Sequence, residues 1–400
     1  MYVQSFTAKE LYRCLSQSER RNFSGTKEEL LQMIQVAAVD KIASGTFHVS
    51  LKAHGKLILN AEPKGSNERL CQDLVFRKLY HNIKRIYKVT QANRSSIIKQ
   101  MLVLLKENVS LWIIRLDVRH FFESIDRDIL MSRMEDKARL NSQSIQLLKE
   151  IDSYLKSSNH HGLPRGLAIS SALSEEYMRY FDLDVQRMDG VYYYARFVDD
   201  IIVFCASKES QKHVWNEIPN MLQHLKLTLN EAKSYKWADT SSCPLSYLGY
   251  DMKIVKGNKK SNQYREVEVS VADKKMRMIK SRITRAFAKY TVERNFENLQ
   301  NRVKFLTGNF TIYSKATLAP IKVGIHFNYE EITTQAQMKE LDLYYQRILH
   351  CKSGTLGSKF LFSKDQIKCL EKYSFEFGFN HHVNHSFTTK MLTTIKQAWL

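Results

Sequence analysis

The chain has 400 residues, of which 44% are hydrophobic and 26% charged, values of a globular protein with a sizeable core. Its 61 Lys and Arg outnumber its 41 Asp and Glu, and the formal charge of +20 favours a polyanionic partner, with nucleic acid ahead of an acidic membrane surface. No apolar run approaches the roughly 20 residues that span a bilayer, and the amino terminus lacks the apolar core of a signal peptide. The six cysteines form no C-x-x-C pair. We therefore expect a cytoplasmic protein without a membrane partner, a zinc knuckle or a disulfide framework.

The first third of the chain predicts short helices, one hairpin and a basic helical segment. We expect a helix over 27–42 and strands over 46–51 and 56–60, with a turn at His54-Gly55. From Arg77 to Lys106 there are eight Lys or Arg and no Asp or Glu, and apolar residues recur near helical spacing on both sides of a loop over 88–96. Such helices can simply present a solvated basic face, but the one-sided charge favours contact with phosphate.

A buried strand is predicted over 111–116, and it ends at Asp117. A carboxylate at the carboxyl end of a buried strand lies where sheet proteins place ligands, although a simple turn residue is an equal alternative. An amphipathic helix is expected from about Arg127 to Met134, with Ser124 or Asp126 as its N-cap. We interpret Asp126 as a cap and not as a catalyst.

A turn is predicted at Gly162-Leu163-Pro164-Arg165-Gly166, followed by a helix over 170–188. This turn delivers Arg165 to the start of the helix, where a cation and free backbone N–H groups can meet a phosphate. The same glycines and proline also suit a loop with no ligand.

The segment from Val191 to Phe204 has the sequence VYYYARFVDDIIVF and predicts a β-hairpin with Asp199 and Asp200 at its tip. Hairpin tips usually contain Asn-Gly or Asp-Gly. Turn propensity does not explain a Val-Asp-Asp-Ile tip, which therefore indicates a functional role for these residues. Adjacent like charges repel, and a bound cation relieves that repulsion. A solvated turn is the alternative.

The remaining elements follow in order. We expect a helix over 208–225, a strand or turn over 227–233 that ends in Lys233, and one strand over 247–252 with a bend at its glycine. From Lys256 to Lys304 there are fourteen Lys or Arg against five Asp or Glu, which suggests a second nucleic-acid surface on long helices over 271–306. A further helix is expected over 333–351. The spacing of His381, His382 and His385 can bind a transition metal, but no Cys or acidic partner lies nearby, so we assign no site there.

Five motifs over about residues 70–255 resemble, in the right order, the palm of reverse transcriptases. Asp117 with the following FFESID resembles the first motif, GLPRGLAIS from Gly162 the second, and FVDD from Phe197 the third. Leu229-Asn230 with Lys233 resembles the fourth, and Tyr247-Leu248-Gly249 resembles the fifth, the primer grip.

This resemblance implies a fold and a chemistry. The fold would be α+β, that of a right-hand polymerase. Residues 1–110 would form an N-terminal region and the fingers, and residues 111–255 would form a palm with an antiparallel sheet and an inserted fingers segment of about 127–165. Residues 256–400 would form a basic, mainly helical thumb and C-terminal region. Two Mg²⁺ ions, held by Asp117, Val118, Asp199 and Asp200, would lower the pKa of the attacking 3′-hydroxyl and stabilise the leaving pyrophosphate. Lys233 would donate a proton to the pyrophosphate.

The resemblance also implies how substrate is bound. Arg94, with Lys88 and Lys99, would hold the incoming triphosphate, and Arg165 and Gly166 would line the substrate site. Phe122 would lie against the sugar and exclude a 2′-hydroxyl, so DNA would be the product. Many reverse transcriptases have Gln at the position of Arg165, and this departure puts ordinary template handling in question.

Within the superfamily, LPRGLAIS and the basic stretch from Ile83 to Gln100 look most like bacterial defence-associated reverse transcriptases of the abortive-infection type. The opening QSFTAKELYR and KVGIHFNY from Lys322 resemble the smaller enzyme of systems that pair two reverse transcriptases with a structured noncoding RNA. This finer resemblance implies antiviral defence, an oligomer, a second reverse transcriptase as partner, and DNA copied from a companion RNA template with dNTPs. Template-independent or protein-primed synthesis, and an inactive palm that serves as an RNA-binding scaffold, remain alternatives.

Overall fold

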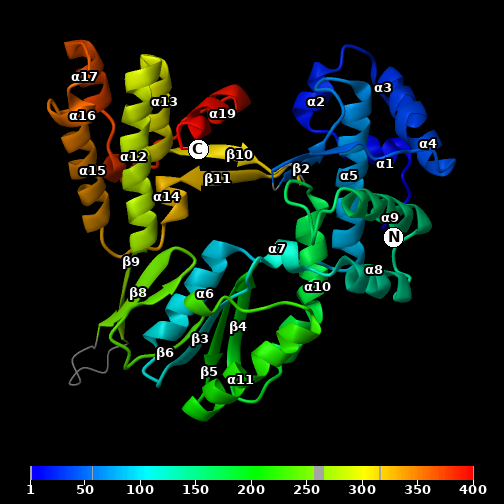
Figure 1. The fold of residues 1–400 in the computed structure, drawn as a ribbon, viewed down its shortest axis with the longest axis horizontal. Helices are drawn as coiled ribbons and strands as arrows, with labels where there is room; N and C mark the ends of the chain where they lie inside the picture. The colour runs from blue at the N-terminus through cyan, green and yellow to red at the C-terminus, as the bar shows by residue number, and fades with distance from the viewer. Residues whose placement is uncertain (1, 56, 256–264, 315–316, 400) are drawn as a thin grey trace. The chain divides into compact units, whose positions relative to one another are not determined.

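The computed structural model describes residues 2–55, 57–255, 265–314 and 317–399, and these form two compact units (Figure 1). Unit 1 consists of Met1–Asn93, Ser110–Ala238 and Lys315–Leu318, and unit 2 consists of Arg94–Val109, Asp239–Ser314 and Ala319–Leu400. Among the described residues, no helix combines the length and the apolar character that crossing a membrane requires.

Unit 1 combines a four-stranded antiparallel sheet, a separate hairpin and helices. The helices are α1 Ala8–Arg13, α2 Gln17–Asn22, α3 Lys27–Ile34, the π-helix η1 Gln35–Val39, α4 Asp40–Ala43, α5 Asn67–Ile86, α7 Phe121–Ser124, α8 Arg127–Asp136, α9 Ser142–Ser157, α10 Ile169–Gln186, α11 Lys208–His224 and the 3₁₀-helix η2 Glu231–Lys233. The strands are β1 Leu51–His54, β2 Leu57–Asn60, β3 Trp112–Asp117, β4 Val191–Phe197, β5 Asp200–Cys205 and β6 Tyr235–Ala238.

The sheet of unit 1 has the strand order β4-β5-β3-β6, and every neighbouring pair is antiparallel. The central strands β3 and β5 are largely apolar and buried, and helices α10 and α11 pack against the sheet. The carboxyl end of β3 and the β4–β5 turn therefore lie side by side at one end of the sheet.

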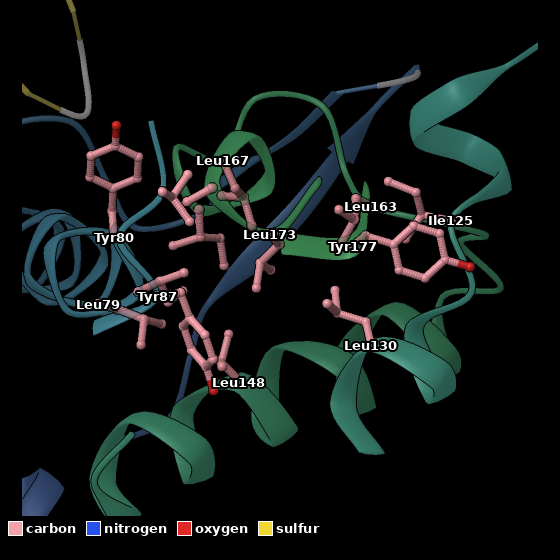
Figure 2. Close-up of a cluster of buried hydrophobic side chains, with 14 of the residues drawn as sticks. Leu79, Tyr80, Tyr87, Ile125, Leu130, Leu148, Leu163, Leu167, Leu173 and Tyr177 are labelled. Carbon is pink, nitrogen blue, oxygen red and sulfur yellow. The ribbon is translucent and has the colours of Figure 1, made fainter. Parts of the chain in front are cut away.

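The core of unit 1 lies between α5, α8, α9 and α10, and its members include residues of the loop before α10. Figure 2 shows Leu163 and Leu167 of that loop among Leu79, Leu148 and Leu173, which come from α5, α9 and α10. Burial of a leucine side chain contributes about 1.5–3 kcal/mol. The loop is therefore held in place by the core and is not a free surface loop.

Unit 2 contains a three-stranded sheet, a second hairpin and a helical part. Its helices are α6 Arg94–Lys106, α12 Asp273–Glu293, α13 Phe296–Thr307, α14 Ile325–Asn328, α15 Ala336–Leu349, α16 Gly354–Gly357, α17 Lys364–Glu371, α18 Phe375–Asn380 and α19 Thr389–Gln397. Its strands are β7 Leu245–Tyr247, β8 Tyr250–Val255 and β9 Glu266–Val271, which form one antiparallel sheet in that order, and β10 Asn309–Tyr313 and β11 Pro320–Gly324, which form the hairpin. Helix α12 packs on both α13 and α15 through apolar stripes.

The mixed α+β class with antiparallel sheets is confirmed, and most predicted elements exist near their expected bounds. The helix predicted over 27–42 is interrupted by the π-helix, and the N-cap of α8 is Asp126, whose side chain accepts a hydrogen bond from the Ile129 N–H. The division into fingers, palm and thumb stays a prediction. The long helices expected over 271–306 are confirmed as α12 and α13.

Two expectations were wrong, and some fall outside the described residues. The single strand predicted over 247–252 is instead the hairpin β7–β8, because Leu248 and Gly249, with φ of 46° and 87°, turn the chain back. The first N-terminal strand begins at Leu51 and not at Thr46. Lys56, and the basic residues within 256–264, lie outside the part of the chain that the structure describes.

Candidate active site

Three carboxylates lie at one end of the sheet in unit 1. Asp117 is the last residue of β3 and pairs directly with Asp200, the first residue of β5, while Asp199 occupies the turn between β4 and β5. Directly opposite residues of an antiparallel pair project from the same face, so Asp117 and Asp200 share a face. The predicted hairpin with its paired carboxylates is confirmed as a structural element.

The turn that presents Asp199 is tight and strained. Phe197 pairs with Asp200, so only Val198 and Asp199 connect the strands. Val198 has φ of 62°, a left-handed conformation that a β-branched residue rarely adopts. The Val118 N–H donates to the Asp199 carbonyl at 3.0 Å, and the buried Arg196 donates to the Val198 carbonyl at 3.0 Å. These bonds hold the strained turn against the end of β3.

Asp117 is 5% exposed and has several hydrogen-bond partners. The Lys233 ammonium lies 2.9 Å and 3.1 Å from its two carboxylate oxygens, and the Asn230 side chain donates to Oδ1 at 2.9 Å. The backbone is fixed as well, since the Asn230 N–H donates to the Asp117 carbonyl and the Asp117 N–H donates to Ser234 Oγ. Residues of the first and fourth sequence motifs therefore meet directly.

The three negative charges are incompletely balanced. Burial raises the pKa of Asp199, and the charge of Asp117 raises it further against the opposing effects of Lys233 and Arg165. Burial likewise raises the pKa of Asp200, with Asp199 and Asp117 adding to the shift and Arg115, 3.6 Å away, opposing it. A cation bound next to these carboxylates would stabilise their ionised forms.

The donor set suits a hard divalent cation. Carboxylate oxygens are the ligands that Mg²⁺ prefers, and a bound cation would offset the burial and mutual repulsion that raise the pKa of Asp199 and of Asp200. The described residues contain no ready group of three His, Cys, Asp or Glu side chains arranged around one point. Instead, Asp117 and Asp200 each face a cation of the chain itself, Lys233 and Arg115.

The glycine loop over 162–166 packs tightly on two other elements. Gly162 has φ of 66°, and a Cβ there would lie 2.1 Å from the Phe122 carbonyl oxygen. At its other end, Gly166 has φ of 104°, and a Cβ would lie 2.7 Å from the Ile58 carbonyl oxygen. The Ile58 N–H of β2 also donates to the Arg165 carbonyl at 2.8 Å. Both glycines are therefore required by close approach as well as by backbone conformation.

Arg165 and Phe122, predicted separately, are neighbours. The Arg165 guanidinium carbon is 5.9 Å from the centre of the Phe122 ring, within the range of a cation–π contact. The same guanidinium forms an ion pair with Glu123, 3.0 Å away. The charge of Arg165 also lowers the pKa of Asp199. The second motif thus contacts helix α7, which is part of the first motif.

Four of the predicted binding residues belong to unit 2. Arg94 donates from Nε and Nη2 to the Leu248 carbonyl at 2.9 Å and 2.6 Å, and its guanidinium lies 4.8 Å from the Tyr250 ring. Leu248 and Gly249 form the β7–β8 turn. Lys99 is 59% exposed and pairs with acidic residues near α14. Lys88, in unit 1, is exposed.

Several residues of this site were missed in the sequence. Arg115 lies two residues before Asp117 on β3, and the two-residue period of a strand could have placed both on one face. Glu123 immediately follows Phe122, but its partner is 42 residues away and no local signal identifies it. In the histidine group, His382 lies against His326 with ring centres 3.7 Å apart and the rings tilted by 35°, and the His385 backbone N–H donates to the Asn309 carbonyl.

The family model "Reverse transcriptase (RNA-dependent DNA polymerase)" matches residues 63–252. None of the curated protein sequences matches the chain. Similar solved structures include telomerase from Candida albicans in complex with a TWJ fragment of telomeric RNA. The sequence identity is 11% and the TM-score is 0.38, and the match covers 86% of this chain and 60% of that chain.

Telomerase from Candida tropicalis is similar in two further structures. Its complex with the TWJ fragment has 13% identity, covers 85% of this chain and 57% of that chain, and gives a TM-score of 0.36. The apo form truncated from the C-terminal domain has 13% identity, covers 50% and 49%, and gives a TM-score of 0.36. The chain thus spans about half to three fifths of the length of these structures.

Proposed function

We propose that the chain, whose residues 63–252 are a reverse transcriptase domain, is an RNA-directed DNA polymerase that adds dNTPs to a 3′-hydroxyl. The observation that supports this function best is the meeting of three sequence motifs at one end of the sheet. Asp117, Asp199 and Asp200 lie together there with Lys233, and the glycine loop contacts the helix with Phe122.

Asp117, Asp199 and Asp200, with the backbone of Val118, would hold two Mg²⁺ ions. When bound, these ions would acidify the attacking hydroxyl and neutralise charge on the phosphates. The unbalanced negative charge of the carboxylates supports this assignment.

The chain's own residues would orient and protonate the substrate. Lys233 would exchange its contact with Asp117 for the triphosphate and donate a proton to the leaving pyrophosphate. Phe122 would lie against the sugar and exclude a 2′-hydroxyl. Arg165 and Gly166 would line the nucleotide site next to it.

The remaining predicted residues would act on other parts of the substrate. Arg94, Lys88 and Lys99 would bind the triphosphate, and Leu248 with Gly249 would hold the primer end. In this structure Arg94 is bound to the Leu248 carbonyl, so its role requires an exchange of partners.

The proposal extends to biological context through the sequence resemblance. The enzyme would copy a structured companion RNA during antiviral defence, as part of an oligomer that includes a second reverse transcriptase. The formal charge of +20 supports a nucleic-acid partner.

Purification of the protein with its bound nucleic acid, followed by incubation with labelled dNTPs and Mg²⁺ and sequencing of template and product, tests this function. A DNA product complementary to the bound RNA is expected. A homopolymeric or random product without a complementary RNA would point to template-independent or protein-primed synthesis.

The variant with Asp199→Ala and Asp200→Ala is the matched test of the site. It should make no product while it retains bound RNA, as measured by filter binding. Polymerisation by this double variant would refute the site assignment, and an inactive wild-type chain that binds RNA would indicate a scaffold.

A further inference from the structure

We propose that Glu123 is a positioning residue that, through Arg165, fixes the ring of Phe122 and so strengthens the preference for deoxynucleotides. The inference rests on the proposed function, in which Phe122 contacts the sugar. It adds a residue that would never touch the nucleotide itself.

The geometry that supports the proposal is a chain of three side chains. Arg165 Nη2 donates to Glu123 Oε2 at 3.2 Å and forms an ion pair with Glu123 Oε1, 3.0 Å away. The Arg165 guanidinium carbon lies 5.9 Å from the centre of the Phe122 ring. On another side, Phe121 meets the same ring edge-on with centres 5.4 Å apart. The ring is therefore bounded by Phe121 and by a cation that Glu123 holds.

The backbone beneath these side chains has little freedom. The Leu163 N–H donates to the Phe122 carbonyl at 2.7 Å, and Gly162 approaches the backbone of Phe122 and Glu123 too closely for any side chain. At the far end of the loop, Ile58 holds the Arg165 carbonyl. Since the main chain is fixed at these points, the orientation of Arg165 depends on what its guanidinium contacts.

Glu123 is the carboxylate that holds the Arg165 guanidinium, at 3.0 Å. The charge of Arg165 already acts on Asp199. Without the Glu123 charge, the nearest remaining negative charge would draw Arg165 away from the Phe122 ring. The ion pair is partly exposed, with side-chain exposures of 50% for Arg165 and 28% for Glu123, so it contributes little to folding stability and its positioning effect can be measured separately.

The experiment measures kcat/KM for dATP and for ATP on one primer and template, in wild type and in Glu123→Gln. We expect the ratio of dATP to ATP to fall about five- to tenfold, mainly through a lower KM for ATP, because cation–π and ion-pair orientation effects are of this size. Glu135→Gln removes the same charge from an exposed ion pair with Lys149 in the same unit and should leave the ratio unchanged.

Two further variants separate positioning from folding. Arg165→Lys keeps a cation between Glu123 and the ring and should retain more of the ratio than Arg165→Ala does. Thermal unfolding of Glu123→Gln should remain within about 2 °C of wild type, as expected for loss of a partly exposed pair. A ratio unchanged in Glu123→Gln, when Phe122→Ala lowers it, would overturn the proposal.

Failure of the proposed function is distinguishable from failure of this inference. If wild type incorporates no nucleotide, isothermal titration of dATP and ATP with Mg²⁺ replaces turnover, and Glu123→Gln should narrow the difference between the two Kd values. Equal narrowing in Glu135→Gln, or none in Glu123→Gln, would overturn the role of Glu123. An unchanged ratio in Phe122→Ala would instead refute the sugar contact and the inference together.

Discussion

The ammonium group of Lys233 bridges both oxygens of Asp117, at 2.9 Å and 3.1 Å. Asp117 is buried, whereas the Lys233 side chain is 48% exposed. Because one partner is fixed and the other reaches solvent, the pair can open without disturbing the core. In this structure Lys233 thus supplies the positive charge next to Asp117. In the proposed function, bound Mg²⁺ would supply that charge instead.

Lys233→Gln should lower kcat by about 100-fold, with a smaller change in KM, because a general acid contributes about 10²–10⁴-fold. Lys233→Arg should not restore the rate, since a guanidinium does not release a proton. Single-turnover nucleotide addition measures this step. Lys236→Gln, which changes an exposed lysine on β6, is the control. Full activity of Lys233→Arg would show that only the charge matters.

Asp199→Asn should raise the free energy of unfolding by about 0.5–1 kcal/mol in metal-free buffer at pH 7 while it abolishes synthesis. The reason is that burial and Asp117 raise the pKa of Asp199, so its ionised form costs free energy in the folded state. Urea denaturation with a chelator present measures the effect. Asp128→Asn, which alters a 77% exposed carboxylate that pairs with Lys156, should not raise the free energy of unfolding. A destabilised Asp199→Asn would contradict this electrostatic account.

Gly162→Ala should destabilise unit 1 by at least about 2 kcal/mol and lower polymerisation, because its Cβ would meet the Phe122 backbone at 2.1 Å. Gly55→Ala is a closely matched control. Gly55 also has positive φ, 58°, but a Cβ there meets nothing within 4 Å, so only the cost of about 1 kcal/mol for a left-handed alanine applies. Equal losses in the two variants would show that close packing at Gly162 is unimportant.

Arg196→Ala should destabilise the protein by about 3–5 kcal/mol, because it removes a buried cation from the partly buried carboxylates of Glu175 and Asp182. Arg196 donates to Asp182 and Glu175 as well as to the Val198 carbonyl, and its side chain is only 3% exposed. Arg196→Lys should recover part of the loss. Chemical denaturation measures both variants, and a loss below about 1 kcal/mol in Arg196→Ala would contradict the expectation.

The Glu19–Arg77 pair gives a pH-dependent contribution to stability. Burial alone would raise the pKa of Glu19, but hydrogen bonds from Arg77 and Ser16 lower it to about 2. A lowered folded-state pKa stabilises the protein above the unfolded-state pKa of about 4.3, and this stability is lost as pH falls towards 2. Glu19→Gln should therefore cost about 1–3 kcal/mol at pH 7, with a difference from wild type that shrinks below about pH 4.3.

Denaturation of wild type and Glu19→Gln at pH 7, 5, 4 and 3 measures that difference. Glu135→Gln serves as the control, since Glu135 forms an exposed pair with Lys149. A difference that stays constant down to about pH 3 would show that the ionised form of Glu19 is not the stabilising species.

Local patterns in the sequence were sufficient to predict the β4–β5 hairpin and the carboxylates at its tip. Alternation and β-branched residues mark β4 and β5, and the Asp199-Asp200 pair at the tip is visible in the sequence alone. The β7–β8 turn was missed because Leu248, which has no turn preference, adopts positive φ there. Its conformation depends on packing that a propensity does not describe.

Contacts between distant residues could not be predicted in this way. The ion pair of Glu123 with Arg165 and the hydrogen bond of Ile58 with Arg165 join segments whose spacing has no periodic signature. Arg115 is an intermediate case, since its position on β3 relative to Asp117 follows from the strand period, but its approach to Asp200 depends on the register of β5.

The hydrogen bond from Ile58 to the Arg165 carbonyl bears on how far the chain can be shortened. Residues 63–252 match the family model, yet this bond, and the close approach of Gly166 to Ile58, tie the glycine loop to a strand that precedes the matched segment. Lys78 and Asn82 of α5 likewise bind the carbonyls of Val3 and Gln4. The smallest active fragment should therefore begin well before residue 63, and trimming to the matched segment would remove the support of the loop that orients Arg165.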